Sequence, residues 1–201
     1  TIWVATSKEM VLYNSDNHNF TPTGYNCIYS SLCIEGGILF GSENIIFRYN
    51  YKSRTMDSIY ICQKKNLDIS EYRIQKMVQL KKNKILIGTK EQGIYLYDCC
   101  TQQLTRFTSD IHHLLISLYV VSDKYVYASF YGNGIYCYNQ DGKIVKSYTS
   151  KTSSLNNNYV LDIIEHKGQL WIATDGGGIN ILDMNSDQIK VMCHVAGDNF
   201  S

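Results

Sequence analysis

The stretch "LWIATDGGGINILD", Leu170 to Asp183, sets two short apolar runs on either side of an aspartate and three glycines. Short runs rich in Ile and Leu around a glycine-rich turn predict two β-strands joined as a hairpin. A dinucleotide-binding loop is excluded, because Ile181 stands where the last glycine of its fingerprint would fall and no helix follows to hold phosphate. We therefore interpret the three glycines as a strand-to-strand turn, where a positive φ favours glycine.

Four other segments share this pattern of an apolar run, a small residue with Ser or Thr nearby, and a second run that ends in Asp or Asn. They are "IWVATSKEMVLYN" from Ile2, "ILFGSENIIFRYN" from Ile38, "ILIGTKEQGIYLYD" from Ile85 and "VYASFYGNGIYCYN" from Val126. The small residues taken as anchors are Ala5, Gly41, Gly88, Ala128 and Ala173, separated by 36, 47, 40 and 45 residues. Propeller blades repeat with a period of roughly 40–45 residues, so the spacing predicts a β-propeller.

The expected fold is all-β, a propeller of four-stranded antiparallel blades with about five repeats in this chain. We place the repeat units at approximately 1–22, 23–65, 66–110, 111–150 and 151–201. In the last unit the predicted strands cover residues 159–166, 169–174, 178–183 and 189–194. The first unit is expected to begin at the second strand of its blade, with further blades on both sides.

Charge and composition exclude several classes of protein. Nineteen basic residues against eighteen acidic ones give a net charge of +1 with no basic stripe, which does not suit nucleic-acid binding. No run approaches the roughly 18 apolar residues of a membrane span. The seven cysteines form no CxxC pair, and their odd number rules out complete internal disulfide pairing. We expect most of them to be small core residues.

Enzymatic and metal-dependent functions find little support in the sequence. The histidines contain no closely spaced ligand pair, and there is no G-x-S-x-G nucleophile elbow. The run Asp183-x-Asn185-x-Asp187 lacks the glycine and glutamate of a calcium loop, so we interpret it as a hairpin turn. We predict no catalytic residue, no metal and no cofactor. The five histidines are His18, His112, His113, His166 and His194.

The segment Ser153 to Asp183 resembles the two-component regulator propeller repeat. The resemblance is good in 85–98 and 126–139 and degenerate in the first two units, where Lys8-Glu9 and Glu43-Asn44 replace the paired glycines. It implies the periplasmic sensor part of a hybrid histidine kinase, seven blades in the complete ring and a homodimer in the intact protein. The membrane helix and the kinase would lie in segments outside these residues.

In a propeller, the turns between the second and third strands share one face with the loops between blades, and this face is a natural ligand surface. Exposed tyrosines beside amides suit sugars, so an oligosaccharide or another small molecule is the expected signal. Tyr95, Tyr97, Tyr136 and Tyr138 are expected in the core instead. The candidate ligand-binding residues are Lys90, Glu91, Tyr131, Asn133, Asn156, Asn157 and Asp175.

Three of these residues, Asn156, Asn157 and Asp175, could equally brace the turns, since such side chains readily bond nearby backbone. Two other functions stay open. One is a protein-interaction platform without a small ligand, which a large exposed apolar patch would favour. The other, less favoured, is an enzyme similar to the streptogramin lyases, which needs histidine and carboxylate around a metal.

Overall fold

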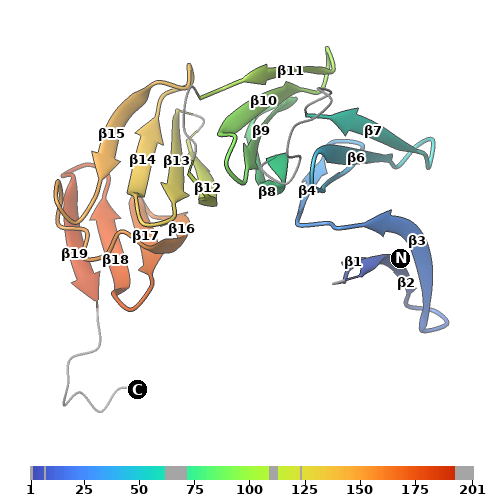
Figure 1. Cartoon of the computed structure of the whole chain (residues 1–201), viewed down its shortest axis with the longest axis horizontal. Coiled ribbons are helices and arrows are strands. Elements are labelled where there is room, and N and C mark those ends of the chain that lie inside the picture. Colours follow the sequence, from blue (N-terminus) through green and yellow to red (C-terminus); the bar gives the residue numbers. More distant parts are fainter. Residues whose placement is uncertain (1, 7, 62–71, 109–112, 123, 193–201) are drawn as a thin grey trace.

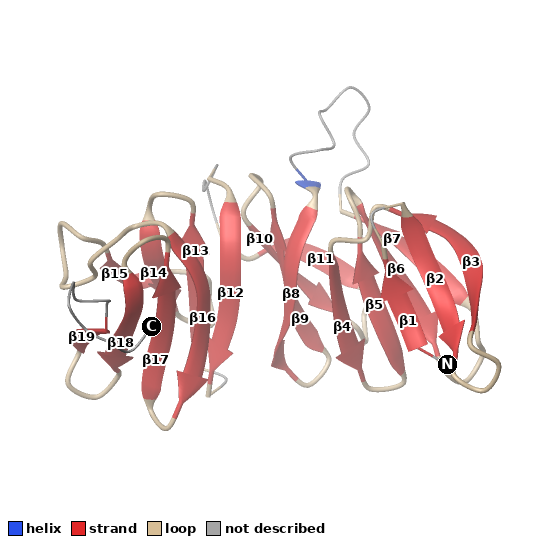
Figure 2. Cartoon of the chain, turned by 90° about the horizontal axis from the view of Figure 1, so that it is seen from below, coloured by secondary structure: helices blue, strands red, loops and turns tan. Residues whose placement is uncertain are grey.

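The computed structural model describes residues 2–6, 8–61, 72–108, 113–122 and 124–192. Within these residues, nineteen strands form five antiparallel sheets, which confirms the all-β propeller prediction. The sheets follow one another around an arc in chain order, and their turns gather at two opposite edges (Figures 1 and 2). No helix in the described part of the chain has the length and apolar character needed to span a membrane.

We number the sheets as blades 1 to 5. Blade 1 holds β1 (Ile2–Ala5), β2 (Glu9–Asn14) and β3 (Asn19–Asn26). Blade 2 holds β4 (Ser30–Ile34), β5 (Gly37–Gly41), β6 (Ile45–Asn50) and β7 (Met56–Tyr60). Blade 3 holds β8 (Ile74–Lys81), β9 (Lys84–Thr89), β10 (Ile94–Asp98) and β11 (Gln103–Arg106). Blade 4 holds β12 (Leu115–Val121), β13 (Tyr125–Phe130), β14 (Gly134–Tyr138) and β15 (Ile144–Tyr148). Blade 5 holds β16 (Val160–His166), β17 (Gln169–Thr174), β18 (Gly178–Asp183) and β19 (Gln188–Met192).

The strands of blade 5 agree with the predicted ranges to within one residue at every described end, while the predicted end at His194 lies outside the described residues. Blade 1 has three strands, and the repeat pattern aligns them with the second, third and fourth strands of the other blades. Its last strand, β3, continues past residue 22, where we placed the first unit boundary, and ends at Asn26.

One anchor of the repeat was wrong by one residue. In blades 3 and 5 the anchors Gly88 and Ala173 lie opposite Ile94 and Ile179 on the third strand. In blade 4 the residue opposite the corresponding Ile135 is Ser129 rather than Ala128. Strand pairing therefore assigns the anchor to Ser129. The sequence alignment chose Ala128 because Ala-Ser resembles the small-residue pairs of the other repeats, but the strand register is shifted by one residue.

The anchor is small because the inner strand of the next blade passes close to it. A Cβ atom added to Gly88 would lie 2.4 Å from Leu115 Cδ2 of β12, and one added to Gly41 would lie 2.5 Å from Ile74 Cγ2 of β8. Carbon atoms in contact normally keep about 3.5–4.0 Å between them, so a larger side chain would push the blades apart. A small residue at the anchors of blades 2 and 3 is thus a requirement of blade-to-blade packing.

The core lies in the seams between blades. Between blades 4 and 5, Tyr127 and Ile135 pack with Leu170, Ile172 and Leu182, and all five are buried. The other two seams with clustered cores join blades 2 and 3 and blades 3 and 4. The core tyrosines behave as predicted: Tyr95, Tyr97 and Tyr138 are buried, and Tyr136 is partly buried against the same cluster as Tyr138.

The cysteine prediction was mostly wrong. Among the five described cysteines only Cys137 is buried, and Cys99 is half-buried. Cys27, Cys33 and Cys100 are exposed. Cys27 follows the outer strand β3, and Cys100 is in a hairpin turn. Cys33 alternates with the half-buried Leu32 and Ile34 along β4 and so points to the opposite side of the strand. All five are free thiols.

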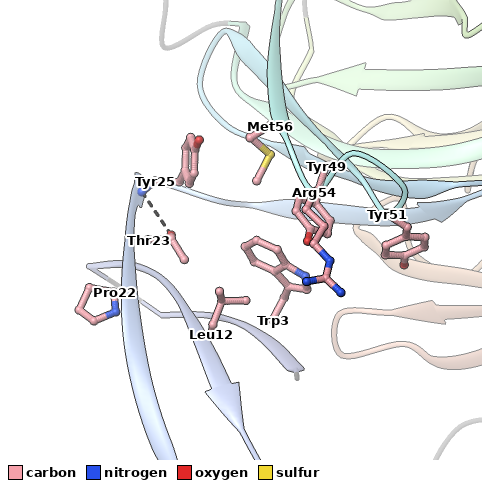
Figure 3. A pocket seen from close by; sticks show the side chains of 9 residues that line it. All are labelled: Trp3, Leu12, Pro22, Thr23, Tyr25, Tyr49, Tyr51, Arg54 and Met56. Atoms are coloured by element: carbon pink, nitrogen blue, oxygen red, sulfur yellow. Dashed lines mark hydrogen bonds between the residues drawn. The ribbon is translucent and has the colours of Figure 1, made fainter.

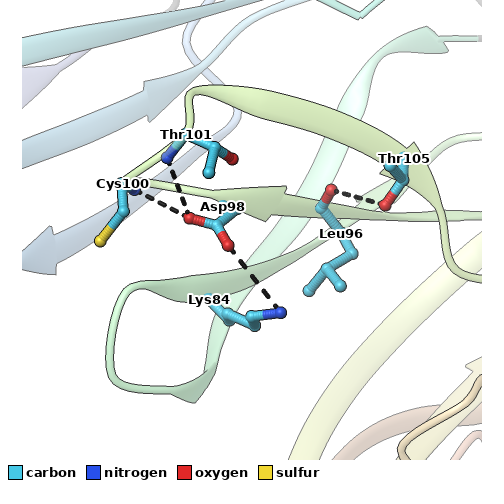
Figure 4. A network of polar contacts seen from close by, with 6 residues as sticks. All are labelled: Lys84, Leu96, Asp98, Cys100, Thr101 and Thr105. Atoms are coloured by element: carbon cyan, nitrogen blue, oxygen red, sulfur yellow. Dashed lines mark hydrogen bonds and ion pairs between the residues drawn. The ribbon is translucent and has the colours of Figure 1, made fainter.

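The Asp or Asn that ends each repeat caps the turn between the third and fourth strands. In blade 3, Asp98 Oδ1 accepts the N–H groups of Cys100 and Thr101 at 2.9 and 3.2 Å, and Lys84 Nζ lies 3.8 Å from the other carboxylate oxygen (Figure 4). The backbone donors, more than Lys84, hold the pKa of Asp98 below its usual range.

The same cap recurs at Asp183, which accepts the N–H groups of Asn185 and Ser186, both at 2.9 Å. The run from Asp183 to Asp187 is therefore a hairpin turn, as predicted. The turn also forces a residue near its end into the left-handed backbone region, where glycine is favoured. These residues are His18, Arg54, Gln102, Gly142 and Asp187.

Candidate ligand-binding face

Backbone hydrogen bonds join each loop between blades to a neighbouring turn between second and third strands. The bonds run from Lys90 N to Arg73 O (2.7 Å), from Tyr131 N to Leu114 O (2.9 Å) and from Asp175 N to Tyr159 O (2.8 Å). Each therefore pins a turn to the residue just before the inner strand of its own blade. The predicted site residues of blades 3, 4 and 5 accordingly occupy one face of the molecule, which we call the loop face.

Lys90 and Glu91 form an ion pair on the loop face, with 3.2 Å between Lys90 Nζ and Glu91 Oε1. Lys90 also bonds neighbouring segments through its backbone, since its carbonyl accepts the N–H of Leu115 in blade 4. The two side chains neutralise each other in part, so they offer a paired dipole rather than a free charge to a ligand.

Asn156 holds the loop before blade 5 against the turn of that blade. Its side-chain amide donates to the carbonyl of Gly177, and its Oδ1 accepts Nδ2 of Asn180 at 2.8 Å. Its backbone N–H donates to Asn180 Oδ1 at 3.1 Å. Asn180 is fully buried and also contacts Thr174 Oγ1 at 3.3 Å, so this network is part of the framework that supports the face.

The other two asparagines also brace turns. Asn157 donates its side-chain N–H to the carbonyl of Asp175 and accepts the N–H of Tyr159 at 2.8 Å. Asn133 donates to the carbonyl of Tyr131 at 2.8 Å. Asp175 differs, because its carboxylate is exposed and accepts no hydrogen bond from the described residues. The hydrogen bonds of Asn156 and Asn157 match the bracing alternative, Asn133 makes a similar bond, and Asp175 keeps a carboxylate available to a ligand.

Tyr131 packs edge-on against Tyr159, with ring centroids 4.9 Å apart and an interplanar angle of 75°. The two side chains are 58% and 43% exposed, so the pair presents aromatic surface to solvent. Gly132 lies directly beneath, and a Cβ there would contact the Tyr159 ring at 3.4 Å. Tyr159 was missed from the sequence, although its place just before an inner strand puts it on the loop face.

A second aromatic residue at an equivalent place before an inner strand was also missed. Tyr29 precedes β4, and the Arg73 guanidinium stacks 4.8 Å from the centroid of its ring. Partial burial, more than any other cause, raises the pKa of Tyr29. The Tyr29 ring is 42% exposed and borders an open groove of about 440 Å³ along the inner strands.

This axial groove carries opposite charges on different blades. Lys76 of β8 and Asp162 of β16 line it, and buried Ser117 of β12 donates a 2.7 Å hydrogen bond to Asp162 Oδ1. All three follow a bulge near the start of their strands. A polar side chain within an otherwise apolar inner strand is a sequence signal for Ser117 alone, because β8 and β16 each carry other polar residues.

The described residues contain no group of three or more His, Cys, Asp or Glu side chains that could hold a metal ion. His113 lies in the loop before blade 4, and His166 ends β16. His112 and His194 lie outside the described residues.

A profile of the two-component regulator propeller family matches residues 154–176. No curated protein matches the chain. Among solved structures, the extracellular domain of the hybrid two-component system BT3049 from B. thetaiotaomicron has a TM-score of 0.68 at 17% identity, over 84% of this chain and 25% of that one. The corresponding domain of the hybrid system BT4673 from the same organism gives 0.68 at 18% identity, over 86% and 26%. The computationally designed protein Ika8 gives 0.65 at 9% identity, over 96% and 60%.

These comparisons confirm the repeat family predicted from Ser153 to Asp183 and the blade architecture. The chain spans about a quarter of the length of the two extracellular domains.

Proposed function

We propose that this chain, whose fifth blade carries a two-component regulator propeller repeat, is a segment of the periplasmic sensor of a hybrid two-component system and detects an oligosaccharide. The observation that carries the proposal is the exposed pair Tyr131 and Tyr159 on the loop face. Asp175 lies next to Tyr159, whose carbonyl accepts its N–H, and its exposed carboxylate accepts no hydrogen bond from the described residues. Aromatic faces stack on the apolar faces of sugar rings, while a carboxylate accepts hydrogen bonds from sugar hydroxyls.

Transmission of the signal would require the ligand to bind two conformations of the sensor with different affinity. The loop face offers a means for this, because its turns are hydrogen-bonded to the segments that lead into the inner strands. A ligand that contacts both Tyr131 and Tyr159 would bridge blades 4 and 5, and so change the free energy of one blade arrangement relative to another. The homodimer, the seven-bladed ring and a kinase elsewhere in the protein stay predictions.

The experiment is a thermal-shift screen of the chain against neutral oligosaccharides. A ligand at about 100 times its Kd should add roughly 2.7 kcal/mol to the free energy of unfolding. Tyr131→Ala should abolish the shift. Tyr125→Ala is the matched control, because Tyr125 is 45% exposed but begins β13 at the opposite edge of blade 4.

A ligand-induced shift that survives Tyr131→Ala unchanged would remove the loop face as the site. A folded chain that responds to no sugar would instead favour the protein-interaction platform. The lyase alternative gains no support from the described residues, which bring no metal-binding group together.

A further inference from the structure

An aromatic cleft of about 740 Å³ lies between blades 1 and 2, away from the loop face. Blade 1 contributes Trp3, Leu12 and Thr23, and the third and fourth strands of blade 2 contribute Tyr49 and Met56. Figure 3 shows these side chains around the opening together with Pro22, Tyr25, Tyr51 and Arg54.

The cleft occupies a seam that is filled at the corresponding places in the rest of the molecule. Tyr49 pairs with Ile38 across blade 2, as Tyr97 pairs with Ile85 and Tyr138 with Val126. Tyr97 and Tyr138 are 0% and 1% exposed, whereas Tyr49 is only half-buried. The seam between blades 1 and 2 is therefore open where its counterparts are packed solid.

The aromatic walls of the cleft are held in place by other rings. Trp3 packs 5.1 Å from Phe40 and 4.9 Å from Tyr49, with an edge-on angle of 62° to the latter. Tyr49 in turn packs 6.0 Å from Tyr51, which is 50% exposed. A preformed set of aromatic faces costs little entropy to bind a ring-shaped ligand.

The cleft also contains a positively charged side chain, Arg54, that forms no ion pair with an Asp or Glu among the described residues. Arg54 is exposed in the turn between β6 and β7. The turn fixes its backbone in the left-handed region, with φ at 58° and its N–H bonded to Asn50 O at 2.9 Å. Figure 3 shows the guanidinium directed to the side of the cleft where Trp3 and Tyr51 lie.

We infer that this cleft is a second binding site, separate from the loop face, for a sugar that carries a carboxylate or sulfate group. The apolar face of the sugar ring would stack on Trp3 and Tyr49, and Arg54 would form two parallel hydrogen bonds to the anionic group. Both anions present the geometry that a guanidinium recognises, so the shared chemistry defines the ligand class.

Trp3 provides a direct readout, because the chain contains only one other tryptophan, Trp171. In a Trp171→Phe background, the fluorescence of Trp3 is titrated with three trisaccharides of equal length: a uronic acid trimer, a sulfated galactose trimer and neutral galactotriose. A saturable change with an acidic trimer and about tenfold weaker binding of galactotriose is expected, since a charge-assisted pair contributes on the order of 1.4 kcal/mol or more. The acidic trimer that binds with the higher affinity shows whether the site prefers a carboxylate or a sulfate.

Arg54→Gln should weaken binding of the acidic trimer by about tenfold. Lys52→Gln is the matched control. Lys52 is exposed, lies two residues before Arg54 and does not line the cleft, so the variant removes one positive charge nearby without altering the site. Equal effects of the two variants, equal binding of galactotriose, or an unchanged Trp3 signal would overturn the inference. Tyr131→Ala should leave the Trp3 titration unchanged, because Tyr131 lies on the loop face. Failure of this inference and failure of the loop-face proposal are therefore distinguishable. Loss of the Trp3 signal in Tyr131→Ala would also overturn the inference of a separate site.

Discussion

The Tyr148 hydroxyl donates a 2.7 Å hydrogen bond to Asp187 Oδ1 and so joins the outer strand of blade 4 to the last turn of blade 5. Lys146 Nζ approaches the same carboxylate oxygen at 3.0 Å. The hydrogen bond from Tyr148, ahead of Lys146, lowers the pKa of Asp187. Tyr148 itself is 5% exposed, and its pKa is raised, mainly by burial.

Tyr148→Phe should lower the free energy of unfolding by about 1 kcal/mol, because the ring still fills its place and only the hydrogen bond to a half-exposed carboxylate is lost. Urea denaturation of the chain measures this difference. Tyr125→Phe removes a hydroxyl from a 45% exposed ring at the opposite end of the same blade and should change stability by less than about 0.5 kcal/mol. Equal losses in the two variants would contradict the role given to Tyr148.

Asn180→Ala should lower the free energy of unfolding by about 2 to 3 kcal/mol, more than Tyr148→Phe does. The fully buried amide bonds both Asn156 and Thr174, and its removal leaves buried polar groups without partners. The comparison variant is Asn133→Ala, whose side chain is half-buried and bonds the single carbonyl of Tyr131. Chemical denaturation should rank Asn180→Ala well below Asn133→Ala in stability, and the reverse order would disprove the network's importance.

The sequence predicts the hairpins of blade 5 well because their signals are local. Residues that favour a turn lie directly between runs that favour strands, so each strand end is determined by its immediate neighbours. Blade 4 shows where this reasoning stops. Its anchor is Ser129 and not Ala128, because register depends on which residues pair across the hairpin, and two similar letter pairs cannot reveal that.

The same limit applies to the site. The parity of the strands places Tyr131 on the loop face correctly, since every second turn points to the same edge. The contact of Tyr131 with Tyr159 spans two blades, however, and depends on how the blades pack. The cleft at Trp3 depends on an incompletely filled seam, which no spacing in the sequence records. The exposed cysteines were missed for a related reason, since an apolar neighbourhood in sequence does not place a residue in a seam.

The packing of successive blades predicts an asymmetric response to larger anchors. Gly88→Val should destabilise the chain by about 2 to 3 kcal/mol, because its new side chain would overlap Leu115 of the next blade. Ala173→Val alters the equivalent position of blade 5, where the anchor is only half-buried, and should cost less than about 1 kcal/mol. Thermal unfolding of both variants tests the comparison, and a larger loss at Ala173 would refute the packing explanation.

The capped turns predict how stability responds to acid. Backbone N–H donors lower the pKa of Asp98 and of Asp183 below the usual value of 3.8. A carboxyl group whose pKa is lower in the folded state stabilises the fold at pH values above its unfolded pKa. That contribution is lost as the pH falls through the folded pKa.

The double variant Asp98→Asn and Asp183→Asn should therefore show a shallower loss of melting temperature between about pH 5 and about pH 2, because asparagine keeps the acceptor oxygen but does not titrate. Asp175→Asn removes one negative charge, half the change made by the double variant, at a carboxylate that accepts no hydrogen bond from the described residues, so it should leave the acid response close to that of the unaltered chain. Differential scanning calorimetry across this range measures the slopes. If Asp175→Asn flattened the profile by half as much as the double variant or more, loss of net charge rather than turn capping would explain the acid response.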